Sequence, residues 1–408
     1  MNKRAMLVAN SASMIDHFNR DNIKILQSMG YDITVAANFR EGNSSSNERI
    51  EEFEKELTAQ GIDIIDLPIP RKVYQLGNMF KSISRLKKYL WDNPCQIIHT
   101  QTPFGGVIGR LAAKKFRKNR LTKVIYFVHG FHFFKGASIT NYLIYYNIEK
   151  YLARFTDCLI TLNHEDYEAA LKFRAKTVEY VPGVGVDTDY IQGITANVAA
   201  KKNELGIPAD KKVILTVAEL IPRKNIETSI RAFASTHNTD CVMLICGKGE
   251  LIDNLKLLCK SLGVSERVIF AGYRTDILEI YKVADVFLFT SYQEGLPVAV
   301  MQAMASGLPV IASDIRGNRD LIMAAESASD KSADSVSNKA ADNSVRSLDC
   351  LTDVNNIDEF TDKLNRLLKN PELCTTLGQR NVMACQKHFD IAIVHEQMTK
   401  IYNNLLNS

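Results

Sequence analysis

Residues 291–314 read SYQEGLPVAVMQAMASGLPVIASD. The apolar run VFLFTS leads into this stretch, the apolar run PVIASD ends it, and a helix-forming segment to about Ala305 lies between them. Strand, helix and strand in this order are typical of a parallel sheet, whose neighbouring strands need a crossover connection. The stretch therefore predicts one βα repeat of a doubly wound α/β domain.

The same alternation extends through most of the chain. One set of apolar runs contains MLVA, ITVAA, QIIHT, KVIYFVH and CLITL, and a second set contains VILTVAEL, CVMLIC and VIFAGY. Runs that are apolar throughout are expected for strands covered on both faces. The Pro/Gly-rich turn VPGVGVDTDY, residues 181–190, separates the two sets. A chain of 408 residues is long enough for two cores.

We therefore expect two Rossmann-like domains, residues 1–185 and 186–389, with a C-terminal helix, about 390–408, that can pack back on the first. Residues 324–347 are rich in Ser, Ala and Asp without an apolar period, which predicts a mobile loop or insertion.

Composition points to a cytosolic protein. Apolar residues make up 46% and charged residues 24% of the chain, as in ordinary globular proteins. The apolar run near the start is too short for a signal peptide, and no run reaches the ~18 residues of a membrane span. The 8 cysteines form no CxxC pair, so we expect reduced core thiols.

Positive charge is concentrated in residues 71–123, which contain 13 Lys or Arg and one acidic residue, Asp92. This excess fits either a solvated helix face or a surface that faces anionic lipid or a phosphorylated acceptor. Nucleic acid is not an expected partner, because the basic residues lie on alternating helices and strands and no nucleic-acid-binding module is present.

Ligands of open α/β sheets bind outside the carboxyl ends of the strands. Glu294 follows the strand VFLFTS and could accept hydrogen bonds from sugar hydroxyls. After Gly295 and Pro297 a helix begins, and its N-terminus is suited to a diphosphate. Gln302 lies eight residues after the glutamate, inside that helix. The alternative is a plain strand–loop–helix corner with a solvated glutamate, and the residues alone do not separate the two interpretations.

Three further strand ends carry candidate residues. Arg223 and Lys224 precede a helix in TVAELIPRKNIETSI, where two cations suit a diphosphate leaving group, although a charged helix start is the alternative. His129 follows the strand in YFVHGFHFFKG, where a lone histidine is more often structural. Gly247 and Gly249 follow a strand in CGKGE, which lacks the full P-loop spacing, and we interpret them as lining a nucleotide cleft.

The stretch EGLPVAVMQAMASGLPVIA resembles the signature of glycosyltransferase family 4, the group 1 glycosyl transferases, which is E-G-x-x-x-x-x-x-E-A-M-A-x-G-x-P-V-V-A. The segment around Lys224 resembles a second family motif, V-G-R-L-x-x-x-K-G/N. Two departures from the family pattern concern ligand contacts, because Gln302 replaces the second glutamate and Glu219 replaces the arginine. A neutral hydrogen bond is weaker than a charged one, so we expect weakened or altered binding of the nucleotide rather than its loss.

The resemblance implies roles for the candidate residues. Glu294 would hold the donor sugar, Lys224 would hold the diphosphate, and His129 would lie beside the donor sugar. Arg223 matches no family position, and we expect it to supply the charge that Glu219 lacks. The donor-binding residues would be Gly247, Gly249, Gly295, Leu296 and Gln302, and weaker acceptor-side candidates are His132 and Lys135. The segment HGFHFFKG resembles sequences of the family branch that builds bacterial capsular polysaccharide and exopolysaccharide.

The family also implies a fold and a reaction. The fold would be GT-B, two facing Rossmann-like domains, with acceptor bound by the first and a nucleotide-sugar donor, a UDP-sugar, by the second. Transfer would retain the anomeric configuration and use no cofactor or metal. Separately, the basic excess in residues 71–123, beside the aromatic stretch Tyr142–Tyr151, predicts association with the inner face of the cell membrane, where the acceptor would be a lipid-linked glycan or a polysaccharide. Asp187 and Asp189 form a D-x-D, but here it matches a family run without a metal role.

Two other functions remain open. A sugar-nucleotide epimerase of the same fold would act without an acceptor. A non-catalytic nucleotide-sugar-binding protein is suggested by Gln302 and Glu219. The sequence does not determine the donor sugar, UDP or GDP as the nucleotide, the acceptor, the linkage or the oligomeric state.

Overall fold

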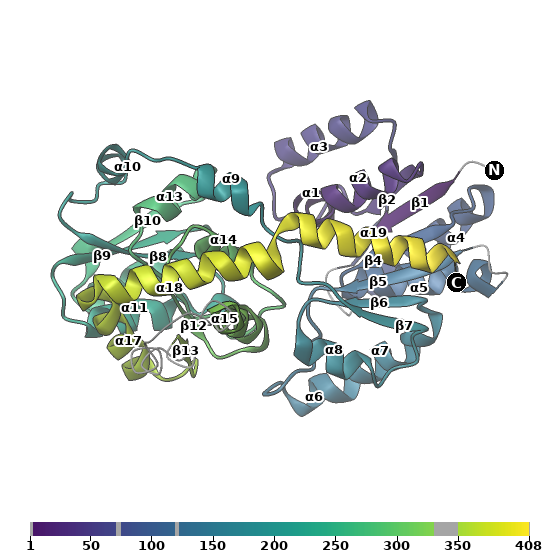
Figure 1. Cartoon of the computed structure of the whole chain (residues 1–408). Coiled ribbons are helices and arrows are strands. Elements are labelled where there is room, and N and C mark those ends of the chain that lie inside the picture. Colours follow the sequence, from purple (N-terminus) through teal and green to yellow (C-terminus); the bar gives the residue numbers. More distant parts are fainter. Residues whose placement is uncertain (1–2, 71–74, 119–121, 330–349, 408) are drawn as a thin grey trace. The chain divides into compact units, whose positions relative to one another are not determined.

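The computed structural model describes residues 3–70, 75–118, 122–329 and 350–407 (Figure 1). The chain divides into two compact units, which we describe separately: unit 1 is Met1–Pro182 with Val394–Ser408, and unit 2 is Gly183–Ile393. The helix α19 (Ile391–Asn407) therefore contributes all but its first turn to unit 1.

Unit 1 is built on a seven-stranded sheet in the order β3-β2-β1-β4-β5-β6-β7, with every pair parallel. Its strands are β1 (Arg4–Val8), β2 (Asp32–Ala37), β3 (Asp63–Asp66), β4 (Ile97–Gln101), β5 (Lys123–Val128), β6 (Cys158–Thr161) and β7 (Thr177–Tyr180). All residues of β4 and β6, and all of β1 except Arg4, are buried, as expected for strands that helices cover on both faces.

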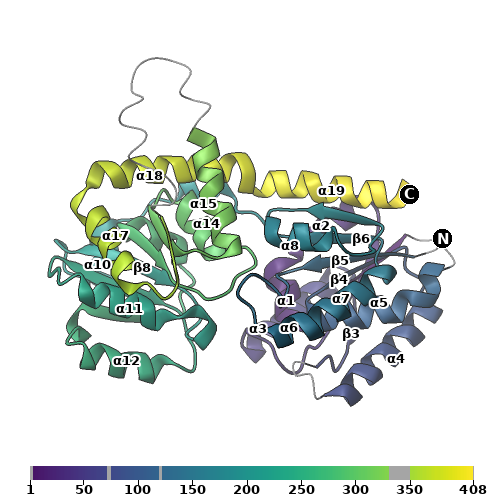
Figure 2. The same ribbon diagram turned by 90° about the horizontal axis from the view of Figure 1, so that it is seen from below.

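The helices of unit 1 follow the strands in turn. They are α1 (Ala12–Phe18), α2 (Arg20–Ser28), α3 (Asn47–Ala59), α4 (Leu76–Asp92), α5 (Pro103–Lys118), α6 (Ile139–Asn141), α7 (Asn147–Leu152) and α8 (His164–Ala170). A π-helical turn, Tyr142–Tyr146, joins α6 to α7, and a 3-10 turn, Ala153–Phe155, follows α7. Figure 2 shows α4, α5 and α7 on one side of this unit, where α5 contacts both of the others.

Unit 2 contains a six-stranded parallel sheet in the order β10-β9-β8-β11-β12-β13. Its strands are β8 (Lys212–Val217), β9 (Cys241–Cys246), β10 (Val268–Gly272), β11 (Val286–Phe289), β12 (Val310–Ser313) and β13 (Leu351–Thr352). Every residue of β9 and β11 is buried, and apolar side chains of the surrounding helices complete the core.

The helices of unit 2 alternate with these strands. They are α9 (Thr188–Gly193), α10 (Val198–Glu204), α11 (Ile226–Ser235), α12 (Ile252–Ser261), α13 (Ile277–Val283), α14 (Val298–Ala305), α15 (Arg316–Ser329), α17 (Ile357–Lys369) and α18 (Pro371–Ala384), with 3-10 turns at Pro222–Lys224 and Ser265–Arg267 and a π-helical turn at Cys385–Phe389. The prediction of two Rossmann-like domains is confirmed, and α14 ends at Ala305 as expected.

One prediction is wrong at its start. The expected loop 324–347 begins inside a helix, because α15 continues to Ser329. Its residues there, AAESAS, contain alanine and glutamate, which favour helix more than the overall Ser/Asp bias suggested. The rest of that segment, from residue 330, lies outside the described residues.

Cysteine and membrane predictions can be compared with the structure. All 8 cysteines are free and all but Cys374 are buried. Burial raises the pKa of Cys95 and of Cys158 to about 12, so these thiols stay protonated near neutral pH. In the part of the chain that the structure describes, none of the helices has the length and apolar character needed to cross a bilayer.

Candidate active site

Three predicted site residues come together in unit 2. Glu294 follows β11, and Lys224 ends the 3-10 turn that follows β8. Because β8 and β11 are neighbours in the sheet, the loops at their carboxyl ends meet. Lys224 Nζ donates a hydrogen bond of 2.6 Å to Glu294 Oε1, and Arg223 Nη1 lies 3.3 Å from Glu294 Oε2. The spacing in sequence alone did not require this contact.

The turn that carries the two cations is fixed by Asn225. This residue has φ of +51°, in the left-handed region that asparagine tolerates better than most residues. Its side-chain amide donates to Thr290 O at 3.1 Å, and the Thr290 hydroxyl donates to Asn225 O at 2.7 Å. Two reciprocal bonds to the end of β11 therefore hold Lys224 opposite Glu294.

Burial strengthens the ion pair. The Glu294 side chain is 9% exposed and that of Lys224 is 14% exposed, whereas Arg223 is 42% exposed. A charge-assisted hydrogen bond in a largely desolvated place is stronger than a neutral one. The carboxylate nevertheless has more lone pairs than these two cations use, so it can still accept a hydrogen bond from a hydroxyl. The exposed guanidinium can meet an anion from solvent.

Two residues that the sequence analysis did not single out support this loop. Arg316, which is 4% exposed, donates from Nε to the main-chain oxygen of Glu294 at 3.1 Å. Gly317 lies against the same loop, where a Cβ would be 2.2 Å from Gly295 O. The signal that could have found them is the pair Arg-Gly just after the strand PVIAS, at the same sheet edge.

The remaining donor-side candidates, Leu296 and Gln302, lie just before α14 and within it. Leu296 is buried and packs near Gly183. Gln302 is partly exposed within α14, and no side-chain hydrogen bond from the described residues engages it. Its amide is therefore available to a ligand, and its contact with the donor stays a prediction.

The structure gives Gly247 and Gly249 a packing role. Gly247 has φ of +154°, and a Cβ there would lie 1.8 Å from Ala218 O. A Cβ on Gly249 would lie 2.3 Å from Leu220 O. Both glycines let the loop after β9 pack against the loop after β8, which also carries the exposed Glu219. Close main-chain packing accounts for glycine at both positions, and their place beside the nucleotide stays a prediction.

In unit 1, His129 follows β5 and is partly buried between aromatic rings. Its ring centroid lies 5.3 Å from that of Phe127 and 5.9 Å from that of Phe18. Burial lowers the pKa of His129 to about 4, so the ring is neutral near pH 7. Its Nε2 lies 2.6 Å from Gln101 Oε1, at the end of the neighbouring strand β4.

The weaker acceptor-side candidates lie in the loop after His129. The ring of His132 stacks on Tyr145 with centroids 4.7 Å apart. Lys135 is exposed, and its backbone N–H donates to Glu165 Oε1 at 2.8 Å. The lysine head group can therefore reach solvent, whereas His132 has a structural partner.

The D-x-D sequence has a local explanation. Asp187 caps α9, since its side chain accepts a 2.9 Å hydrogen bond from Tyr190 N. Across the described ranges, no group of three or more His, Cys, Asp or Glu side chains is arranged to hold a metal ion.

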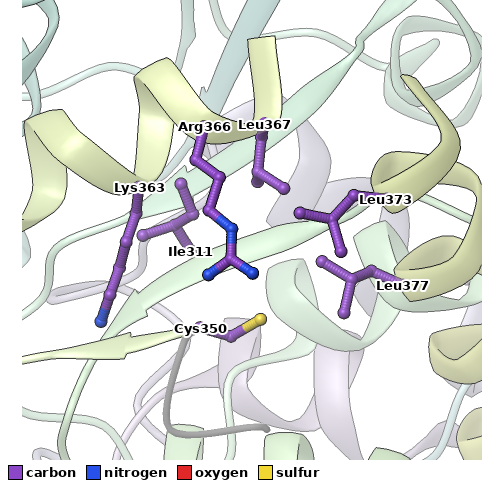
Figure 3. Close-up of a pocket in the computed structure, with 7 residues that line it drawn as sticks. All are labelled: Ile311, Cys350, Lys363, Arg366, Leu367, Leu373 and Leu377. Carbon is purple, nitrogen blue, oxygen red and sulfur yellow. The ribbon is translucent and has the colours of Figure 1, made fainter. Parts of the chain in front are cut away.

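Figure 3 shows a pocket elsewhere in unit 2. Its walls are mostly apolar side chains of α17, α18 and β12, and the guanidinium of Arg366 extends into it toward Cys350. None of the predicted site residues lines it; the lining residues are Ile311, Cys350, Lys363, Arg366, Leu367, Leu373 and Leu377. This pocket is separate from the Glu294 loop.

Comparison with known proteins identifies the family. The family model for glycosyl transferases group 1 matches residues 197–382, and the model for glycosyl transferase 4-like proteins matches residues 6–163. EpsD of Bacillus subtilis (strain 168), which is named as a glycosyltransferase, is 31% identical over 408 residues, 99% of this chain and 97% of EpsD. The chain belongs to glycosyltransferase family 4. The first match contains Lys224 and Glu294, and the second contains His129.

A further relative and two solved structures also resemble this chain. A UDP-Gal:alpha-D-GlcNAc-diphosphoundecaprenol alpha-1,3-galactosyltransferase of Escherichia coli is 32% identical over 250 residues, 59% of this chain and 64% of that protein. HepE of Anabaena, solved with UDP-glucose, superposes with a TM-score of 0.73 at 18% identity, covering 98% of this chain and 99% of HepE. Sucrose-phosphate synthase of Thermosynechococcus elongatus gives 0.74 at 18% identity, covering 99% and 100%. This family 4 protein therefore has the GT-B fold.

Proposed function

We propose that this protein is a retaining glycosyltransferase that moves a sugar from a UDP-sugar to a lipid-linked acceptor during synthesis of a bacterial surface polysaccharide. The observation that carries the proposal is the buried Lys224–Glu294 pair, with Arg223 beside it, at the carboxyl ends of β8 and β11. HepE, which shares the fold, was solved with UDP and with UDP-glucose, and the name of the Escherichia coli relative specifies a diphosphoundecaprenol acceptor.

Each residue has a chemical role in this proposal. Arg223, Lys224 and the N-terminus of α14 stabilise the diphosphate that leaves, because cations and free N–H groups favour developing negative charge. The bond from the anomeric carbon to the diphosphate oxygen breaks, and a bond to the acceptor oxygen forms on the same face. The acceptor hydroxyl passes its proton to the departing diphosphate oxygen. Glu294 orients the donor sugar through its hydroxyls.

The direct test supplies the purified protein with a panel of UDP- and GDP-sugars and an undecaprenyl-diphosphate-linked sugar. We expect one UDP-sugar to give a glycosylated lipid whose new linkage keeps the anomeric configuration of the donor, as read by NMR of the product. Conversion of the nucleotide sugar without acceptor would identify an epimerase instead. Tight binding in a thermal-shift screen without any turnover would identify a binding protein, the alternative that Gln302 and Glu219 suggest.

We expect the transfer rate to be unchanged by EDTA. The cationic groups of Arg223 and Lys224 can do the electrostatic work that a metal does at other transferases. The measurement is the initial rate of sugar transfer before and after chelation. Activity that disappears in EDTA and returns with Mg²⁺ or Mn²⁺ would refute metal independence and return attention to Asp187 and Asp189.

We further propose that unit 1 binds the cytoplasmic surface of an anionic membrane through α6, α7 and the turn between them. This segment exposes an unusual density of large apolar side chains, which would be costly to leave in water. They are Ile139, Tyr142, Leu143, Ile144, Ile148 and Tyr151. The segment is held firmly, because Glu149 of α7 pairs with the buried Arg110 of α5 at 2.8 Å.

Helices α4 and α5, which lie on the same side of the unit as α7 (Figure 2), also carry positive charge. The exposed cations there are Lys81, Arg85, Lys87, Lys88, Lys114 and Lys115. The excess counted in the sequence is larger than the charge available to lipid, because Arg110 and Arg117 are paired with Glu149 and Asp157. Exposed apolar and aromatic side chains beside cations are typical of peripheral membrane proteins.

Leu143→Glu is expected to weaken binding to anionic vesicles by tenfold or more, because it places a charge where an apolar side chain would enter the lipid. The control is Leu257→Glu in α12 of unit 2, since both leucines are 66% exposed. The measurement is co-sedimentation with phosphatidylglycerol vesicles at low and high salt. Equal binding by the two variants, or wild-type binding that is the same at low and high salt, would exclude this surface as the membrane-binding site.

A further inference from the structure

A hydrogen-bond network of buried polar side chains in unit 1 ends at His129. Four of its members, Asn19, His99, Gln101 and Tyr402, have no exposed surface, and Asn22 is 8% exposed. Polar groups buried this deeply are tolerated when they are hydrogen-bonded to one another. They come from α1–α2, β4 and α19, so several distant segments of the chain contribute to the surroundings of one histidine.

The backbone carbonyl of Met14 determines which groups of this network donate and which accept. The Asn19 side chain lies 3.2 Å from Met14 O, and because a carbonyl oxygen can only accept, the Asn19 atom there must be the amide nitrogen. The same nitrogen lies 2.8 Å from Gln101 Oε1. In return, Gln101 Nε2 donates to Asn19 Oδ1. The orientation of the Gln101 amide therefore follows from Met14 O.

This orientation determines the protonation of His129. Gln101 presents its Oε1 to His129 Nε2 at 2.6 Å, and an amide oxygen accepts but does not donate. Nε2 must therefore carry the hydrogen. Since the ring is neutral near pH 7, Nδ1 then has a lone pair. Among the residues that the structure describes, none forms a hydrogen bond with Nδ1.

At the other end of this network, the hydrogen bonds of His99 and Tyr402 run in one consistent direction. Gln101 Nε2 lies 3.4 Å from His99 Nε2, which leaves His99 Nδ1 to donate to the Tyr402 hydroxyl at 2.7 Å. The Tyr402 hydroxyl then donates to Asn22 Oδ1 at 3.2 Å. Burial lowers the pKa of His99 to about 3, so it is neutral as this arrangement requires. Every hydrogen bond of this network therefore pairs one donor with one acceptor.

We propose that Gln101 is a positioning residue that holds His129 in the Nε2–H tautomer, so that His129 accepts a hydrogen bond from a substrate hydroxyl through Nδ1. The hydrogen on Nε2 follows from the contacts around Gln101, and the lone pair on Nδ1 follows from the neutral state of the buried ring. The identity of the partner as a sugar hydroxyl rests on the proposed function. A neutral acceptor at this position excludes His129 as a cationic partner of the diphosphate.

The tautomer can be measured without substrate. In long-range ¹H–¹⁵N spectra of the full-length protein labelled at histidine nitrogens, the signal missing from His129→Asn identifies His129. We expect wild type to show Nε2 protonated and Nδ1 unprotonated near pH 7. Gln101→Met removes the acceptor without adding charge, so the Nδ1–H form should become detectable. Protonated Nδ1 in wild type, or an unchanged tautomer in Gln101→Met, would overturn the proposal.

The hydroxyl contact is tested by two replacements of His129. Asn places an oxygen where Nδ1 stands, whereas Gln places its terminal group near Nε2. We expect kcat/KM of His129→Asn to exceed that of His129→Gln by about fivefold, the value of one neutral hydrogen bond. The reverse order would refute the Nδ1 contact. Wild type that transfers no sugar would refute the proposed function instead, while the spectra would still decide the tautomer.

Discussion

Glu294→Ala is expected to lower kcat by about 10²–10³, the usual effect of removing one well-placed electrostatic contact. The carboxylate accepts from Lys224 at 2.6 Å and lies beside Arg223, so it fixes both cations. In the proposed function it also orients the donor sugar, and the cations meet the diphosphate. Removing it leaves Lys224 in a largely buried place without its partner. The substitution therefore affects sugar and diphosphate together.

Glu294→Gln separates these two effects. The amide keeps the shape and one acceptor but loses the charge that attracts Lys224. We expect kcat between those of wild type and Glu294→Ala, with a thermal midpoint closer to wild type. The measurements are donor-saturation kinetics and thermal unfolding of both variants. A near-normal kcat in Glu294→Ala would mean that the site is assigned wrongly.

Gln302 serves as the matched comparison. It is partly exposed on α14, eight residues after Glu294, and we expect it to contact only the ribose. Gln302→Ala should therefore raise the donor KM and leave kcat largely unchanged, the pattern of uniform binding. Gln302→Glu restores the family residue and should hold or tighten donor binding. If it abolishes binding instead, the glutamine is adapted to another ligand and the binding-protein alternative gains support.

Gly247→Ala is expected to lower the free energy of unfolding by about 3–5 kcal/mol, through backbone strain and overpacking together. The residue has φ of +154°, which L side chains rarely adopt, and its Cβ would lie 1.8 Å from Ala218 O. The obstructing atom belongs to the main chain, so it cannot rotate away. The loop after β8 would have to move, and that loop leads into Lys224.

Gly193→Ala is the control in the same unit, because no atom lies within 4 Å of its added Cβ. We expect its stability to stay within about 0.5 kcal/mol of wild type, as for ordinary surface changes. Denaturant unfolding of both variants, followed by circular dichroism, provides the comparison. A Gly247→Ala protein as stable as the control would show that the two loops do not pack as described.

The candidate site was only partly predictable from the sequence. Each of Glu294, Lys224 and His129 follows an apolar run, and the ends of parallel strands are where ligands bind, so a single sequence sufficed to nominate them. Gly247 and Gly249 were nominated by the same reasoning, yet their surroundings are main-chain atoms of the neighbouring loop. A glycine after a strand indicates close approach, but the sequence does not say whether the approaching group is ligand or protein.

The sequence by itself determined that the chain forms two Rossmann-like sheets, because uninterrupted apolar runs alternating with helices have few other ways to bury both faces of each strand. Only the tertiary structure decided which strand ends meet. The order β8-β11 brings Lys224 to Glu294, and a contact across 303 positions joins His99 to Tyr402. Such pairings depend on the order of strands and on the path of α19, which hydrophobic periodicity does not encode because it reports only which face of an element is buried.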